Sequence, residues 1–206
     1  SKVTILELLP QILPGMDRDI SQSLKMNLKK LGVDIVTSAE TQKIEKSASG
    51  WKIFYKFKDE DNELECSELL CATGRKPCYE GALAEGVELK TERGRIVVNN
   101  KFETNVPGIY AIGDIVEGPQ LAHKATAEGI ALADIFAGKE PCVDTKLVPS
   151  CIYTHPNIAV VGLSEAQAKE QNIPIVTGKV VTGANGKSVV NQDPRGFVKL
   201  IAHADS

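Results

Sequence analysis

A glycine and an aspartate that precede a helix form the stretch of this sequence best suited to ligand binding. The apolar run Ile109–Ile112 predicts a buried strand that stops at Gly113, which permits close backbone approach, and at Asp114, which offers a carboxylate. Residues 118–123 then lead into a helix whose first backbone N–H groups have no partner within it. Such a place can bind a polyol hydroxyl, an electron-rich carbonyl or an anion. An Asx turn or a helix cap is the alternative role for Asp114.

Two further residues stand where predicted strands end. Glu7 closes the predicted strand 2–7, and Gly74 follows the predicted strand 68–72. In an open α/β sheet, ligands bind beyond the carboxyl ends of the strands, so these residues and Asp114 mark one potential binding rim. A carboxylate such as that of Glu7 can accept both ribose hydroxyls of an adenosine and so select NAD over a 2'-phosphorylated cofactor. The alternative for Glu7 is a solvated acid at a strand end.

Three reactive side chains have positions that favour structural roles. His123 lies in the first turn of a predicted helix, where a histidine more often packs or caps than acts as a general base. Cys66 and Cys71 have the CxxxxC spacing of a redox disulfide. Cys71, however, falls inside the predicted strand 68–72, and residues an odd number of positions apart point to opposite faces of a strand. We therefore expect these two cysteines to be structural.

The elements that would position the strand ends begin with a βαβ unit. Predicted strands 2–7 and 33–36 flank a helix that has Asp17 as its N-cap and runs to Leu31. A connection of this kind makes the two strands parallel. The apolar face of the helix is predicted to hold Ile20, Leu24, Leu28 and Leu31.

The remainder of the chain predicts an antiparallel meander and then two mixed regions. From about Ala39 the apolar residues alternate with polar ones, most clearly over 51–57, as in antiparallel strands. A strand near 96–98 and a helix over 121–137 follow. In the last region, Gln167 completes a capping box for a helix after Ser164. The strands predicted there are 152–153, 158–161, 175–181 and 197–201. These elements predict an α/β fold.

The composition excludes several classes of protein. The 206 residues are 42% hydrophobic and 25% charged, and a net charge of −3 with interspersed signs gives no basic surface for nucleic acid. No apolar run is long enough to cross a bilayer, and we expect no membrane partner. Five cysteines, an odd number, argue against a disulfide scaffold and favour a reducing compartment. No cluster of residues suggests a metal site.

Three motifs carry a resemblance to a known family. The segments ATGRKP, VPGIYAIGDIVEGPQLAHKATAEG and VPSCIYTHPNIAVVGLSEAQAKE occur in this order and resemble the flavin-dependent pyridine nucleotide-disulfide oxidoreductases. The strongest likeness is to the dihydrolipoamide dehydrogenase branch, and it extends to VTILELLPQILPGMD. The resemblance implies parts of Rossmann-like FAD- and NAD(P)-binding domains, followed by the start of an α+β dimerisation domain. The expected ranges are 1–77 for the NAD-binding part, 78–143 for the FAD-binding part and 144–206 for the dimer-interface part.

The resemblance also implies binding residues, cofactors and partners. The implied FAD contacts are Gly113, Asp114, Gln120, Leu121, Ala122 and His123, and the implied NAD contacts are Glu7, Thr41, Gly74 and Arg75. The implied partners are a second copy of the chain and the lipoyl domains of 2-oxoacid dehydrogenase complexes or of the glycine cleavage system. The location would be the cytoplasm, or the mitochondrial matrix in a eukaryote. Two positions depart from the family pattern, because Thr41 and Asn157 stand where an aliphatic residue and a glutamate are usual.

The family's redox-active cysteine pair, its two Gly-rich turns and its His-Glu acid-base pair have no counterpart in these residues. We therefore expect the 206 residues to be an internal piece of a longer parent, to contain no catalytic residue and to be inactive alone. Two alternatives stay open at this point. One is a related flavin disulfide reductase or mercuric reductase, and the other is a non-catalytic dimerisation or binding module. The upstream sequence would discriminate between them.

Overall fold

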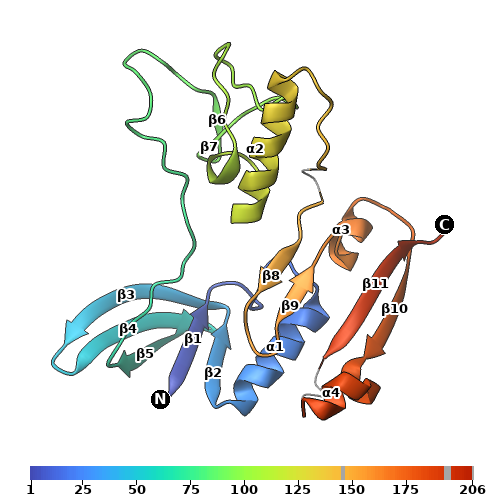
Figure 1. The fold of residues 1–206 in the computed structure, drawn as a ribbon. Coiled ribbons are helices and arrows are strands. Elements are labelled where there is room, and N and C mark those ends of the chain that lie inside the picture. The colour runs from blue at the N-terminus through green and yellow to red at the C-terminus, as the bar shows by residue number, and fades with distance from the viewer. Residues whose placement is uncertain (145–146, 193–195, 206) are drawn as a thin grey trace. The chain divides into compact units, whose positions relative to one another are not determined.

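The chain forms two compact units in a computed structural model that describes residues 1–144, 147–192 and 196–205 (Figure 1). The first unit contains Ser1–Cys71, Tyr153–Ile158 and Leu163–Ser206, and the second contains Ala72–Ile152 and Ala159–Gly162. Parallel and antiparallel strands occur together with helices, which confirms the predicted α/β class. Among the described residues, no helix combines the length and the apolar character needed to cross a membrane.

The first unit begins with the predicted βαβ arrangement. Strand β1 (Val3–Glu7) pairs in parallel with β2 (Val33–Thr37), and α1 (Arg18–Lys30) connects them. Leu24 lies on the buried face of this helix, as predicted, whereas Leu31 is 71% exposed. The prediction for Leu31 was wrong because this residue is the C-cap, beyond the last turn that packs on the sheet. The register places Glu7 opposite Thr37 at the carboxyl ends of both strands.

A three-stranded antiparallel meander follows, also as predicted. Its strands are β3 (Ala39–Ser47), β4 (Gly50–Phe57) and β5 (Glu60–Cys66), and Ile53 in the central strand is almost fully buried. The β3–β4 register shifts between Thr41 and Lys43, which makes β3 irregular at that point.

The strand predicted over residues 68–72 is absent. These residues are extended and exposed, and Cys71 therefore has no buried strand around it. An apolar run becomes a strand only where a neighbour supplies backbone hydrogen bonds, and no described strand pairs with this segment. Cys66 ends β5, and Cys66 and Cys71 form no disulfide with each other.

The C-terminal part of the first unit is built from a helix and a hairpin. Helix α3 (Glu165–Glu170) has the predicted capping box, in which Ser164 Oγ accepts from the Gln167 N–H and the Gln167 side chain accepts from the Ser164 N–H. Strands β10 (Ile175–Val181) and β11 (Phe197–His203) pair antiparallel. The short helix α4 (Gly186–Val190) between them was not predicted, and Asn185 caps it. Strands β8 (Ser150–Ile152) and β9 (Ile158–Val160) form a separate two-stranded sheet.

The second unit contains a short hairpin and one long helix. The hairpin contains β6 (Thr91–Glu92) and β7 (Arg95–Ile96), and the helix is α2 (Ala122–Phe136), close to its predicted range. Its buried core is small and holds Ile96, Ala111 and Val116.

Residues 109–112 were predicted to form a buried strand, and this prediction was wrong. Their backbone makes single hydrogen bonds, such as the one that Ala111 N donates to Phe102 O, and the only strand-like contact in this run is the isolated bridge between Glu103 and Tyr110. The run contributes side chains to the core, which explains its apolar pattern. It has no continuous neighbouring strand, so its backbone does not form a strand.

One lysine joins three parts of the first unit that are distant in the sequence. Lys199 Nζ in β11 lies 2.7 Å from Asp17 Oδ2, 3.0 Å from Asp19 Oδ1 and 2.8 Å from Glu165 Oε1, and its side chain is only 9% exposed. Asp17 was predicted to cap α1, but its side chain makes no cap hydrogen bond and instead accepts from the Glu165 N–H. The cluster therefore fastens β11 and α3 to the start of α1.

The charges in this cluster shift two pKa values in opposite directions. Burial lowers the pKa of Lys199, but hydrogen bonds with Asp17, Glu165 and Asp19 outweigh it and raise that pKa above its ordinary value. Burial raises the pKa of Asp19, whereas Lys179 and Lys199 lower it, and the net pKa is lowered. The stabilisation from Asp19 is present above its unfolded pKa and is lost as the pH falls through the folded pKa. The stabilisation from Lys199 is present below its unfolded pKa and is lost as the pH rises through the folded pKa.

We predict that Lys199→Met lowers the free energy of unfolding of the unit by about 1.5–3 kcal/mol, the range for a lost hydrogen bond to a charged group. The loss should be largest between about pH 5 and 10, because outside the unfolded pKa values of about 3.9 and 10.4 the wild-type cluster also weakens. Thermal unfolding of both proteins at pH 3, 7 and 9 measures it. The control is Lys2→Met, which removes an exposed pair with Asp34 and should have almost no effect. An equal loss at pH 3 and pH 7 would contradict the assignment.

Candidate functional site

The predicted aspartate sits in a tight turn that packs directly on helix α2. Residues Gly113–Ile115 form a 3-10 turn, and Gly113 has a φ of +79°, in the left-handed region that favours glycine. A Cβ at Gly113 would lie 3.2 Å from Ala125 Cβ on the helix, so the turn and the helix are in close contact. Asp114 itself is half-buried. The glycine therefore serves both the bend of the chain and its approach to α2.

A buried ion pair on α2 holds the backbone of this turn. Lys124 Nζ and Glu128 Oε1 are 2.7 Å apart, and both side chains are only 5% exposed. Glu128 Oε2 accepts a hydrogen bond of 2.7 Å from the Gly113 N–H, and Lys124 Nζ donates at 3.5 Å to the Gly113 carbonyl. The side chain of Lys124 also fills the space beside Gly118, where a Cβ would lie 2.7 Å from its Cε.

Sequence reasoning missed both members of this pair. The buried residues of α2 are Lys124, Glu128 and Ala131, a spacing of four and three that marks one face of a helix. Two charged residues on the face that packs against the core must be paired, because an isolated charge is costly to bury. This pattern was visible in the sequence and could have identified them.

Two other side chains hold the rest of the turn. Arg95 Nη1, on β7, donates to the carbonyls of Val116 at 3.1 Å and of Gly118 at 2.6 Å. Gln120 Nε2 donates to the Asp114 carbonyl at 3.3 Å. Gln120 was predicted to contribute its backbone to a ligand, and its side chain has this additional local role. Arg95 was not predicted.

The helix start that follows has the predicted character, with one exception. Ala122 and His123 are the first two residues of α2, so the helix itself supplies no acceptor for their N–H groups. Leu121, the N-cap residue, is extended, and its N–H donates to the Pro119 carbonyl at 3.1 Å. That N–H is therefore already engaged within the chain.

His123 has a structural contact, in line with the sequence interpretation. Its ring is exposed, and Nε2 lies 2.6 Å from the Pro149 carbonyl oxygen. A carbonyl only accepts, so Nε2 carries the proton in this contact and is not a base there. The histidine thus ties the start of α2 to the segment before β8.

The predicted NAD residues lie in both units. Glu7 ends β1, and its Oε1 accepts from the Leu9 N–H at 2.8 Å, which orients the carboxylate. Thr41 is exposed in β3 just before the irregularity in that strand. Gly74 and Arg75 belong to the second unit and lie in an exposed extended segment, where Gly74 has a φ of +103°. A Cβ at Gly74 would have no close neighbour, so it is the backbone conformation that favours glycine there.

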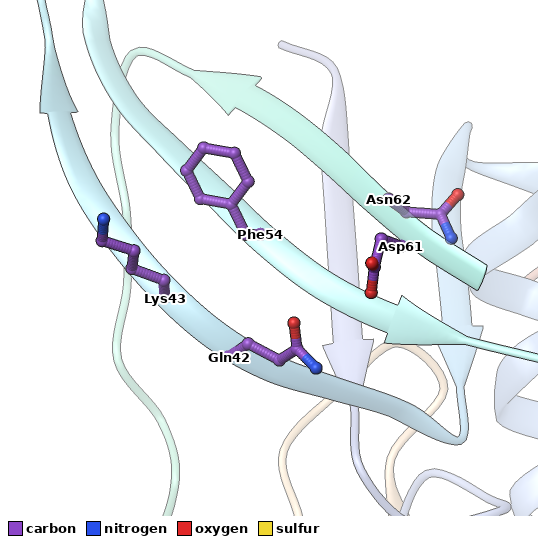
Figure 2. A pocket seen from close by; sticks show the side chains of 5 residues that line it. All are labelled: Gln42, Lys43, Phe54, Asp61 and Asn62. Carbon is purple, nitrogen blue, oxygen red and sulfur yellow. The ribbon is translucent and has the colours of Figure 1, made fainter. Parts of the chain in front are cut away.

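The meander carries a hollow of about 320 Å³ that no sequence feature predicted (Figure 2). The hollow lies over the three strands β3, β4 and β5, next to the shift in the β3 register, and the Phe54 ring provides its apolar wall. The lining residues are Gln42, Lys43, Phe54, Asp61 and Asn62. None of the predicted cofactor residues lines it.

Comparison with protein families gives two adjoining matches. Residues 1–129 match the family described as pyridine nucleotide-disulphide oxidoreductase. Residues 148–206 match the dimerisation domain of the same family. The first match alone covers more than half of the chain and includes the turn at Asp114.

Curated relatives cover the whole chain. A dihydrolipoyl dehydrogenase of Geobacillus stearothermophilus is 37% identical over 206 residues, which are 100% of this chain and 44% of the relative. One of Staphylococcus aureus is 39% identical over 98% of this chain and 43% of the relative. The mitochondrial dihydrolipoyl dehydrogenase 1 of Arabidopsis thaliana is 35% identical over 100% of this chain and 41% of the relative. The chain thus spans less than half the length of the curated relatives it matches.

Solved structures give the same picture of the fold. The HOCl-induced flavoprotein disulfide reductase RclA of Escherichia coli matches with a TM-score of 0.81 and 29% identity, over 100% of this chain and 47% of that chain. Its Cu(II) complex matches with a TM-score of 0.83 and 29% identity, over 100% and 46%.

The packing at Gly113 leads to a prediction with a matched control. Gly113→Ala should lower the free energy of unfolding by more than the cost of about 1–2 kcal/mol for a side chain in the left-handed region, because the new Cβ also crowds Ala125. Gly108→Ala is the control, since Gly108 has a φ of +78° with open space at its Cβ, and it should show the backbone cost alone. Thermal unfolding of the two variants measures the difference. Equal losses would mean that the turn does not pack tightly on α2.

Proposed function

This chain belongs to the pyridine nucleotide-disulphide oxidoreductase family, and on that basis we propose that it is part of an FAD-dependent dihydrolipoyl dehydrogenase. Such an enzyme passes electrons from dihydrolipoamide through a redox disulfide and FAD to NAD. The observation that carries the proposal is the match of the entire chain to dihydrolipoyl dehydrogenases at 35–37% identity. The chain would supply cofactor-binding residues to this enzyme and no catalytic residue.

The turn at Asp114 fits the proposed role in FAD binding. Its carboxylate is half-buried, and no hydrogen bond to that carboxylate is formed among the described residues, so its oxygens can accept from a ribityl hydroxyl. The N–H groups of Ala122 and His123, at the positive end of α2, would face the electron-rich pyrimidine oxygen of the flavin, next to the backbone of Gln120 and Leu121. Bound FAD supplies the two-electron chemistry. The chain's own part is to hold and orient it.

The residues proposed for NAD are Glu7, Thr41, Gly74 and Arg75. The Leu9 N–H engages one oxygen of the Glu7 carboxylate, and the remaining lone pairs can accept from both ribose hydroxyls. Thr41 would line the adenine. Gly74 would let the backbone approach the nicotinamide ribose, with the cationic Arg75 nearby.

The division of the chain and its partners are also proposals. The three proposed parts are residues 1–77, 78–143 and 144–206, and the match of 148–206 to a dimerisation domain supports a homodimer. The names of the curated relatives support lipoyl domains as substrates, either of 2-oxoacid dehydrogenase complexes or of the glycine cleavage system. The proposed location is the cytoplasm, or the mitochondrial matrix in a eukaryote. The name of an Arabidopsis relative, which includes the word mitochondrial, supports the second location.

A related flavin disulfide reductase is the second candidate, because the matched solved structures carry that description. Their identity of 29% is lower than the 37% to a dihydrolipoyl dehydrogenase, which favours the first proposal. A non-catalytic dimerisation module has no observation in its favour beyond the motifs that these residues lack. Reduction of NAD by dihydrolipoamide, catalysed by the full-length protein, tests the function. Activity with other disulfides or mercuric ion, but none with dihydrolipoamide, would favour the second candidate.

The choice between NAD and NADP depends on Glu7 in this proposal. Glu7→Arg in the full-length protein should shift the ratio of kcat/KM for NADP over NAD upward by about tenfold or more. An attractive charge then replaces a repulsive one beside the 2'-phosphate, a difference of more than about 1.4 kcal/mol. The control Asp34→Arg makes the same change of charge on the neighbouring strand, away from its carboxyl end, and should leave the ratio unchanged. The same ratio in Glu7→Arg as in wild type would show that Glu7 does not face the ribose.

A further inference from the structure

The buried pair of Lys124 and Glu128 is poorly placed to stabilise its own helix. Lys124 is the third residue of α2, where the positive end of the helix dipole disfavours a cation. The order lysine then glutamate, four residues apart, is also the weaker of the two orientations for a helical ion pair. Both charges are nevertheless removed from water, with side chains that are 5% exposed. An explanation for the pair must therefore lie in what it contacts outside the helix.

Outside α2, the pair contacts the two ends of one short segment. At Gly113 the glutamate accepts from the N–H and the lysine donates to the carbonyl, so the backbone is held from both sides of one residue. At Gly118 the lysine side chain packs against the backbone. Asp114 directly follows Gly113 in the chain, so the contacts that hold Gly113 also restrict the position of Asp114. Arg95 donates a hydrogen bond to the Gly118 carbonyl.

We propose that Glu128 is a positioning residue for FAD binding, and that Lys124 holds it in place for this role. Glu128 acts through the Gly113 N–H, which fixes the turn so that the Asp114 carboxylate is already set for a ribityl hydroxyl before the cofactor arrives. This inference rests on the proposed role of Asp114 in FAD binding. Glu128 does not itself touch the cofactor.

The physical reason for such an arrangement is preorganisation. A turn with a glycine at a φ of +79° has other conformations available, and ordering it upon binding would reduce the affinity. A carboxylate acceptor for the Gly113 N–H removes most of these conformations in advance, because a buried N–H without a partner is costly. The pair then needs a specific order along the helix. The acceptor must stand at 128, one turn after the donor, to meet the Gly113 N–H.

This requirement for order separates a positioning role from a merely stabilising ion pair. The double variant Lys124→Glu with Glu128→Lys restores two opposite charges, in the orientation that a helix prefers. It places an ammonium where the Gly113 N–H needs an acceptor. If the pair only stabilises the fold, the exchanged pair should serve as well as the native one. If Glu128 positions the turn, the exchanged pair should fail.

The experiment uses the full-length protein and two measurements. The first is the dissociation constant of FAD for the apoprotein, followed by quenching of flavin fluorescence. The second is the amide hydrogen exchange of the peptide that contains Gly113 and Asp114, in the absence of FAD. The variants are Glu128→Ala, Glu128→Gln and the exchanged pair. The matched control is Glu103→Ala, which also removes a glutamate that accepts from a glycine N–H, that of Gly108, in another turn of the same unit.

We expect Glu128→Ala and the exchanged pair to weaken FAD binding by about tenfold or more, and to speed exchange at Gly113 by a similar factor, as the loss of a buried hydrogen bond predicts. Glu128→Gln retains an acceptor and should stay within about threefold of wild type. Glu103→Ala should leave both measurements unchanged. If Glu128→Ala does not fold, Glu128→Gln and the exchanged pair still give the comparison.

Two results would overturn the inference. One is wild-type affinity for FAD in the exchanged pair. The other is an unchanged dissociation constant and exchange rate in Glu128→Ala, even if its unfolding temperature falls. Failure of the wild-type protein to bind FAD would instead refute the proposed function, and the exchange rates alone would then decide whether Glu128 orders the turn.

Discussion

The hydrogen bond from the Gly113 N–H to the buried carboxylate of Glu128 is the contact on which the candidate FAD site depends. It joins the 3-10 turn at Gly113 to the long helix of the second unit, and Lys124 forms an ion pair with the same carboxylate. This contact fixes Gly113, the residue before Asp114, while Gln120 and Arg95 hold the carbonyls that follow it in the turn. A site made largely of loop residues thus acquires the rigidity of a helix.

The first unit uses charge in a similar way at a place where no cofactor is proposed. Lys199 is surrounded by carboxylates that come from the start of α1 and from α3, with Asp17 and Glu165 among them. In both units, a lysine with little exposure is satisfied by more than one polar group. Such clusters specify how elements meet, because a misplaced partner would leave a charge buried without compensation.

The sequence predicted those features that depend on local pattern. The βαβ unit, the meander, the capping box at Ser164 and the range of α2 follow from periodicity and capping residues within a few positions of each other. The predictions of strands over 68–72 and 109–112 were wrong. A strand also needs a neighbouring strand to pair with, and an apolar sequence pattern does not show whether one is present. The charged pair on α2 was not predicted. Its spacing on one face of the helix, shared with the buried Ala131, was the signal that could have identified it.

In the proposed FAD site, the Asp114 carboxylate, in a turn held by Glu128, accepts a hydrogen bond from a hydroxyl of the ribityl chain. A crystal structure of the full-length protein with bound FAD tests it most directly. The account predicts an Asp114 carboxylate oxygen within about 2.5–3.0 Å of a ribityl oxygen, with the Gly113 N–H still donated to Glu128. Bound FAD with no contact to Asp114, or a turn that has released Glu128, would contradict it.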